Sequence, residues 1–152
     1  MKSLLLIILL NLSSYNSDIN TIRKLYLSAH TNEYNCNNLG KKLTFIEDNT
    51  SILIKGYEGC FYFIKCKFIN NPIEKLIYFR KGKKLLETAI KEDPKSVELK
   101  FLRYSIQKNL PRFLSYHDNL ERDLNFVNAN ITSINNKEEQ KFIINSLKSI
   151  TK

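Results

Sequence analysis

The 152-residue chain has few of the residues that interrupt regular structure, with four glycines and three prolines. Gly and Pro are the strongest local breakers, so their scarcity disfavours a β fold built from short strands and tight turns. It favours long helices that short loops connect. The length is typical of a single domain with its own hydrophobic core.

Histidine and cysteine are also scarce. His30 and His117 are the only histidines, which leaves histidine-based metal sites short of ligands. The cysteines, Cys36, Cys60 and Cys66, lack CxxC spacing, which disfavours a structural zinc site. On one predicted helix Cys60 and Cys66 would lie about 9 Å apart, beyond the roughly 7 Å limit for a disulfide. We expect buried thiols, at most one disulfide involving Cys36, and no cofactor or metal.

Residue patterns typical of enzymes are missing as well. Lys81–Lys84 (KGKK) does not have the spacing of a phosphate-binding loop and falls inside a predicted helix. His117 and Asp118 are adjacent, so on a helix they point about 100° apart and cannot form a dyad. We therefore predict that the protein is not an enzyme. A site assembled from scattered Tyr, Arg and Glu residues is kept as an alternative.

The formal net charge is +9, from 24 Lys and Arg against 15 Asp and Glu. Lysine supplies most of the positive charge, whereas nucleic-acid surfaces more often bring arginine and interleaved aromatic residues. We interpret the excess as a solvated basic surface and predict no nucleic-acid partner. A cytoplasmic, basic nucleic-acid-binding module is the alternative.

The N-terminal stretch Met1–Ser17 has the pattern of an export signal, with Lys2, the apolar run Leu4–Leu10 and then small polar residues. The apolar run is shorter than the roughly 20 residues that span a bilayer. We predict a signal peptide at residues 1–17 and a single periplasmic or secreted domain at residues 18–152, without a transmembrane segment. A buried N-terminal helix is the alternative.

Apolar residues recur every three or four positions along most of the chain, which predicts helices. No stretch shows useful strand-like alternation, so the predicted fold class is all-α, with six to seven antiparallel helices and no strands. Gly56 and Gly59 are expected to permit close approach of a neighbouring backbone. The predicted helices are Ile19–Ala29, Asn32–Phe45, Leu53–Phe68, two within Pro72–Pro111, one carrying Phe113 to Val127, and Lys137–Ile150, which Asn136 and Glu139 would cap.

The stretch Pro72–Pro111 is predicted to be the central helical hairpin, broken at Asp93 and Pro94. Asp93 would cap the second helix and Pro94 would occupy its first position, where a missing N–H costs nothing. The core is predicted to include Leu53, Tyr57, Cys60, Ile64, Leu76, Leu86, Ala89 and Phe101.

Within this hairpin, Gly82, Ala89 and Pro94 stand where a tetratricopeptide repeat (TPR) places its small, small and proline residues, and Leu86 fills the large apolar position between them. The segment Pro72–Lys108 thus resembles one TPR hairpin. The neighbouring stretches do not repeat the pattern, whereas a solenoid needs at least about three repeats.

A longer resemblance runs through Asn20–Tyr26 (NTIRKLY), Lys55–Gly59 (KGYEG) and Asp93–Asp123. These segments are similar to small exported helical proteins of bacteroidete bacteria, a family without an assigned activity. The resemblance implies export and an all-α fold, and it supplies no catalytic residue.

Four polar residues, Arg103, Gln107, Asn109 and Tyr116, are candidate binding residues. Arg103 and Gln107 are four positions apart and so share one helix face. One interpretation is that these residues bridge neighbouring helices or cap a helix end. The functional hypothesis is a polar groove for a peptide or a partner's carboxylate. The sequence therefore favours a non-enzymatic, monomeric protein- or peptide-binding or scaffold module of the cell envelope.

Overall fold

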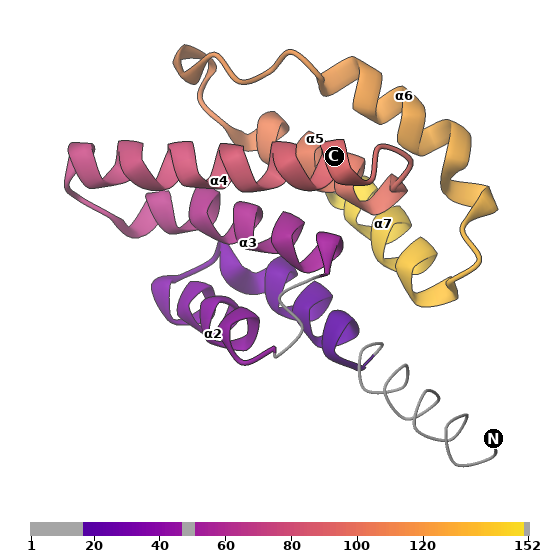
Figure 1. Cartoon of the computed structure of the whole chain (residues 1–152), viewed down its shortest axis with the longest axis horizontal. Helices are drawn as coiled ribbons and strands as arrows, with labels where there is room; N and C mark the ends of the chain where they lie inside the picture. Colours follow the sequence, from indigo (N-terminus) through magenta and orange to yellow (C-terminus); the bar gives the residue numbers. More distant parts are fainter. Residues whose placement is uncertain (1–16, 47–50, 151–152) are drawn as a thin grey trace.

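The computed structural model describes residues 17–46 and 51–150, and all regular elements among them are helices (Figure 1). The predicted all-α class and helix number are confirmed for this part of the chain. The antiparallel, TPR-like arrangement stays a prediction. Of the predicted export signal, residues 1–16 lie outside the described residues. The α-helices are an N-terminal helix at residues 17–29, α2 (Glu33–Thr44), α3 (Ile52–Lys65), α4 (Pro72–Glu92), α5 (Val97–Asn109), α6 (Leu120–Asn130) and α7 (Lys137–Ile150).

Short polar side chains set the starts of most helices. Asn71 Oδ1 accepts hydrogen bonds from the N–H groups of Ile73 and Glu74, and Pro72 occupies the first turn of α4. Asn136 Oδ1 accepts from Glu138 and Glu139 at the start of α7. These oxygens satisfy backbone donors that have no partner within the helix. Short 3-10 turns extend or link the helices: η1 (Cys66–Phe68), η2 (Arg112–Leu114) and η3 (Ile131–Ser133).

The predicted start of α5 at Pro94 is wrong. Asp93 ends α4 instead, since its N–H donates to Ala89 O at 2.9 Å. The helix begins three residues after Pro94 because Ser96 is extended and its hydroxyl accepts from Leu99 N at 3.2 Å. Serine and aspartate are both good caps, and here the later one starts the helix.

The predicted helix through Phe113 also begins later than expected. After η2, Ser115 adopts a left-handed conformation with φ of 49°, which a continuing right-handed helix does not allow. Helix α6 then starts at Leu120. As a result Phe113 is 82% exposed, whereas Tyr116 points inward and is 2% exposed.

Helices α3 and α4 lie side by side and touch through backbone (Figure 1). A Cβ added to Gly59 would lie 2.8 Å from Leu86 N and 2.9 Å from Gly82 O, and one added to Gly82 would lie 2.8 Å from Gly59 O. Real Cβ atoms do not approach so closely, so both positions require glycine. The predicted close approach at Gly59 is confirmed.

Helix α5 lies at the centre of the domain, and from Val97 to Gln107 every residue except Lys100 is buried. Of the predicted core residues, Tyr57, Cys60, Ile64, Leu86, Ala89 and Phe101 are buried and Leu53 is half-buried. Leu76 is 44% exposed, so that assignment is wrong. Side chains three positions apart on a helix point in directions that differ by about 60° around its axis. Two such steps therefore place Leu76 about 120° from Gly82, away from α3.

The three cysteines are free thiols, with Cys36 and Cys60 buried and Cys66 partly exposed. Burial raises the pKa of the Cys36 thiol to about 11. Such thiols are protonated at neutral pH and are poor nucleophiles. The expectation of buried thiols is confirmed for Cys36 and Cys60.

Candidate functional site

A cleft of about 710 Å³ opens where the N-terminal helix meets the first turns of α3, α5 and α7. Its apolar lining includes Ile19, Ile52, Leu53, Val97 and Ile134, and its polar lining includes Arg23, Asp93, Lys95, Glu98 and Glu139. The cleft is therefore amphipathic, and its wall combines segments from both halves of the chain.

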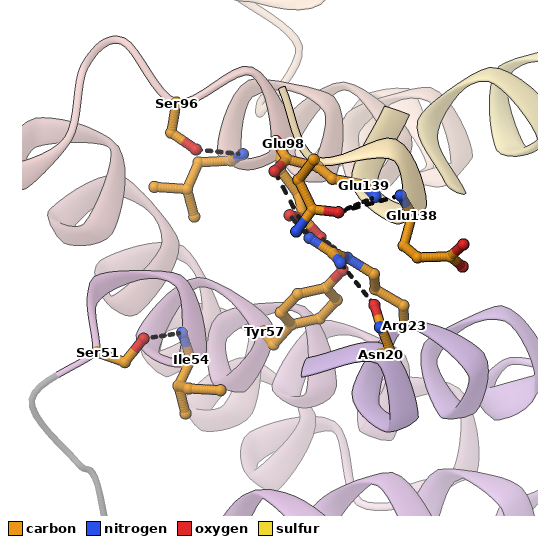
Figure 2. Close-up of polar contacts among 11 residues, drawn as sticks. Asn20, Arg23, Ser51, Ile54, Tyr57, Ser96, Glu98, Glu138 and Glu139 are labelled. Atoms are coloured by element: carbon orange, nitrogen blue, oxygen red, sulfur yellow. Dashed lines mark hydrogen bonds and ion pairs between the residues drawn. The ribbon is translucent and has the colours of Figure 1, made fainter. Parts of the chain in front are cut away.

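Three capping residues, Ser51, Ser96 and Asn136, also line this cleft. Each accepts a hydrogen bond from the first turn of its own helix, α3, α5 or α7 respectively. Figure 2 shows the bonds to Ser51 and Ser96. The N-terminal end of a helix carries a partial positive charge. The positive ends of three helix dipoles therefore lie at the cleft.

The inner wall of the cleft is a buried ion pair between Arg23 and Glu98 (Figure 2). Arg23 Nε donates to Glu98 Oε1 at 2.8 Å, and Arg23 Nη2 donates to Glu98 Oε2 at 2.6 Å. Tyr57 donates its hydroxyl to Glu98 Oε1 at 2.5 Å, and Arg23 Nη1 donates to Asn20 Oδ1 at 2.8 Å. Burial raises the pKa of Tyr57 well above its usual value, so this hydroxyl stays a donor. Bidentate geometry fixes the orientation of the guanidinium plane.

Glu139 lies on the same wall, with Oε2 3.8 Å from Arg23 Nη2 and a side chain that is 23% exposed. Burial, followed by repulsion from Glu98, raises its pKa to about 7, although Arg23 acts in the opposite direction. The carboxyl group therefore exchanges its proton near neutral pH and can either donate or accept a hydrogen bond in the cleft. The predicted cap at Asn136 is present, and the Glu139 side chain lies close to Arg23.

The predicted site residues Arg103 and Tyr116 lie in a second, separate cluster. Arg103 donates to both oxygens of Asp123, at 2.6 and 2.8 Å, and to Glu87 Oε2 at 2.7 Å. Tyr116 donates to Glu87 Oε1 at 2.5 Å and stacks on Phe63. Burial and the Glu87 carboxylate raise the pKa of Tyr116. The cluster therefore joins α4, α5 and α6.

The other two predicted residues lie along α5. Gln107 Oε1 accepts from Asn119 N at 3.3 Å, and its Nε2 has no hydrogen-bond partner among the described residues. Asn109 is exposed and donates Nδ2 to Ser105 O at 2.8 Å. Arg103, Gln107 and Tyr116 are 4%, 0% and 2% exposed. Arg103, Gln107 and Tyr116 thus contact other segments of the fold, whereas Asn109 bonds its own helix. Contact of these four residues with a partner stays a prediction.

Sequence reasoning missed Arg23, Glu98 and Asp123 as members of these clusters. A signal was nevertheless present, because each charge falls on an apolar stripe. Arg23 follows Ile19 by four positions and precedes Tyr26 by three. Asp123 follows Leu120 by three and precedes Val127 by four, and Glu98 precedes Phe101 and Leu102 by three and four. Charged residues at such positions are buried only when paired.

Comparison with known proteins gives no relative. The chain matches no protein-family model, no curated protein and no solved structure. Within residues 17–46 and 51–150, no group of three or more His, Cys, Asp or Glu side chains has an arrangement that could hold a metal ion. In the same ranges, no helix is long and apolar enough to cross a bilayer.

Proposed function

We propose that this protein is a non-enzymatic protein- or peptide-binding module and that the cleft beside Arg23 and Glu139 is its binding site. The observation that carries the proposal is the size and lining of the cleft. Ligand sites in proteins are typically about 300–1,000 Å³, with an apolar lining and a few fixed polar groups. The volume of about 710 Å³ lies in that range, and apolar side chains line the cleft together with a larger number of polar ones.

The chemistry of the lining favours a peptide. Lys95 and the first turns of three helices present positive charge, which suits carbonyl oxygens and carboxylates. Glu139, which titrates near neutral pH, offers an acceptor for peptide N–H groups. Leu53 and Ile134 offer apolar contact. Because Glu98 holds Arg23 in a bidentate pair, the polar wall is fixed before a ligand arrives, which lowers the entropy cost of binding.

Selection of a displayed peptide library against the immobilised protein would test the proposal, followed by calorimetric titration of a recovered peptide. Ser133 is exposed and lines the cleft, so Ser133→Trp should fill it and weaken binding by about tenfold or more. Lys95→Glu reverses a charge at the cleft and should change the affinity of a charged peptide.

Two matched controls share the chemistry but not the position. Thr132 is exposed and adjacent to Ser133, and Lys141 is an exposed lysine; neither is part of the cleft lining. Thr132→Trp and Lys141→Glu should bind the recovered peptide within about twofold of the unchanged protein. Equal binding by Ser133→Trp and its control would remove the cleft as the site.

Salt separates this proposal from the alternative of a basic nucleic-acid-binding module. Contacts to phosphates weaken steeply as salt rises, because counterions are released on binding. Contacts in an amphipathic cleft should respond much less. Tight binding of an oligonucleotide that salt abolishes, together with no recovered peptide, would favour the alternative.

We also propose that the domain is exported, to the periplasm or beyond the cell, and acts there as a monomer. The support is the pattern at Met1–Ser17. N-terminal sequencing of the protein from its native envelope tests this directly, and an intact Met1 on a cytoplasmic protein would contradict export. Size-exclusion chromatography with light scattering tests the monomer.

A further inference from the structure

We propose that the N-terminal half of α4 docks onto a lipid bilayer that carries anionic headgroups. The first observation is a set of exposed aliphatic side chains: Ile73 is 71%, Leu76 44% and Ile77 60% exposed. Isolated apolar residues on a surface need no explanation. Three within two turns of one helix form a patch that water solvates poorly.

The second observation is the charge that adjoins this patch. Ile73, Ile77, Arg80 and Lys84 follow one another at spacings of four, three and four, so they share one face of α4. Gly82, which touches α3, lies on the opposite face. Arg80, Lys81 and Lys84 are exposed. The face that points away from α3 is therefore aliphatic in its first turns and basic in the next.

Acidic side chains on α4 offset only part of the positive charge of this face. On α4, Glu87 is paired with Arg103 and Glu92 with Lys55. Glu74 is the remaining acid of the helix, in its first turn. The whole chain also carries a formal net charge of +9. The face is thus complementary to a negatively charged surface.

A bilayer satisfies both halves of this face at once. Aliphatic side chains gain free energy on entering the acyl boundary, while Lys and Arg contact lipid phosphates. A nucleic acid offers phosphates but no partner for Ile73 and Ile77, since it stacks bases on aromatic or arginine side chains. The observations therefore favour the lipid surface over a nucleic acid.

The position of α4 allows such contact. Figure 1 shows its N-terminal half reaching the left edge of the molecule, while α5 and α7 lie toward the other end. The cleft uses Asp93 and Lys95, beyond the C-terminal end of α4. Docking through Ile73 and Ile77 would therefore leave the cleft open, so this inference stands apart from the proposed peptide binding.

Tryptophan fluorescence provides the sharpest test, because the chain contains no Trp. The full-length variant Ile77→Trp is mixed with vesicles made of equal parts phosphatidylcholine and phosphatidylglycerol, or of phosphatidylcholine alone. Its emission should shift to shorter wavelength with the anionic vesicles and stay unchanged with the neutral ones. The matched control is Phe45→Trp, at a position beside α2 that is also exposed, at 79%. Its emission should not shift.

Vesicle sedimentation tests the aliphatic and the basic residues of this face of α4 separately. Ile73→Ser with Ile77→Ser should reduce binding to anionic vesicles about tenfold, because it removes the aliphatic contact. Arg80→Glu with Lys84→Glu should reduce it by at least as much, because it reverses the charge. The control Lys141→Glu with Lys148→Glu makes the same charge change at exposed positions of α7 and should bind nearly as the unchanged protein does.

Several results would overturn the proposal. These are no sedimentation with anionic vesicles, sedimentation without an emission shift at position 77, and serine variants that bind as tightly as the unchanged protein. Binding to a DNA duplex that needs Arg80 and Lys84, without binding to vesicles, would assign the face to nucleic acid instead. If the serine variants fail to fold, as circular dichroism would reveal, the emission shift of Ile77→Trp decides alone.

Discussion

The two buried arginine clusters contain the same chemical groups in different surroundings. Helix α5 contributes to both: it supplies the carboxylate of Glu98 to the first and the guanidinium of Arg103 to the second. Each arginine is held in a bidentate pair, and a tyrosine hydroxyl completes each cluster. The first cluster borders the cleft. In the second, Phe63 and Phe79 pack on the ring of Tyr116.

The two clusters therefore differ in their surroundings rather than in their chemical groups. A buried ion pair is by itself weak evidence for stability, since desolvation offsets much of the attraction. The Arg103 cluster joins three helices in the interior, so its expected role is to hold them in register. The Arg23 cluster presents one side to the cleft.

The largest expected effect is the loss of Arg103. Arg103→Ala leaves Asp123, which is 0% exposed, without its bidentate partner, and such uncompensated charges cost about 3–5 kcal/mol. Arg23→Ala should cost less, about 1–3 kcal/mol, because Tyr57 still donates to Glu98 and water can enter from the cleft. Urea unfolding would give both values.

Arg122→Ala is the control for this comparison, since Arg122 is an exposed arginine on α6. Its effect should stay within about 0.5 kcal/mol. Equal losses for Arg103→Ala and Arg23→Ala would mean that the cleft does not relieve the buried carboxylate of Glu98, and the proposed distinction between the clusters would fail.

Replacing both members of the Arg103–Asp123 ion pair should recover most of the stability that Arg103→Ala loses. Arg103→Met with Asp123→Leu removes the charges together and keeps apolar volume, so stability should return to within about 1 kcal/mol of the unchanged protein. Glu87 is 35% exposed and keeps its bond from Tyr116. A double variant as unstable as Arg103→Ala would show that the pair has a specific role beyond its mutual compensation.

For the tyrosine hydroxyls, the larger loss of stability is expected in the Arg23 cluster. Tyr57→Phe removes a donor from Glu98, whose side chain is 1% exposed, and should cost about 1.5–3 kcal/mol. Tyr116→Phe removes a donor from Glu87, which is partly exposed and can take a water molecule instead, so the loss should stay below about 1 kcal/mol. Thermal unfolding of both variants, which keep their aromatic rings, would check this order.

The smallest expected effect concerns Glu139 and pH. Its pKa is raised from 4.5 to about 7 in the folded protein, so the folded state binds more protons than the unfolded state between these values. The free energy of unfolding should therefore fall as pH rises through this range. Because water screens the partly exposed side chain, the change should be about 1 kcal/mol.

Glu139→Gln should remove this pH dependence, whereas Glu138→Gln, at the exposed neighbouring position, should retain it. Urea unfolding at about pH 5 and about pH 8 would measure the difference between the variants and the unchanged protein. Identical profiles for Glu139→Gln and the unchanged protein would contradict the raised pKa.

Local sequence information was enough to predict the helices but not the cleft. Apolar spacing and capping residues act over three or four positions, which is why α7 and its Asn136 cap were predicted correctly. Two caps in succession, Asp93 and Ser96, made the start of α5 ambiguous. The left-handed Ser115 had no signal that separated it from a helical serine.

The clusters depend on pairing across the chain, which spacing does not encode. Arg23 and Glu98 are separated by 75 positions and Arg103 and Asp123 by 20. Arg103, a polar residue predicted on α5, has its partners Asp123 and Glu87 inside the fold. Charged residues on apolar stripes were the available signal, but they do not identify their partners.

The central position of α5 has a consequence for how the protein opens. The carboxylate of Glu98 ties α5 to the N-terminal helix and α3, and the guanidinium of Arg103 ties it to α4 and α6. None of these neighbours can detach without breaking a charged contact to the same helix. The amide hydrogens of α5 should therefore exchange with solvent only when the whole domain unfolds. Those of α2, which belongs to neither cluster, should exchange through smaller local openings.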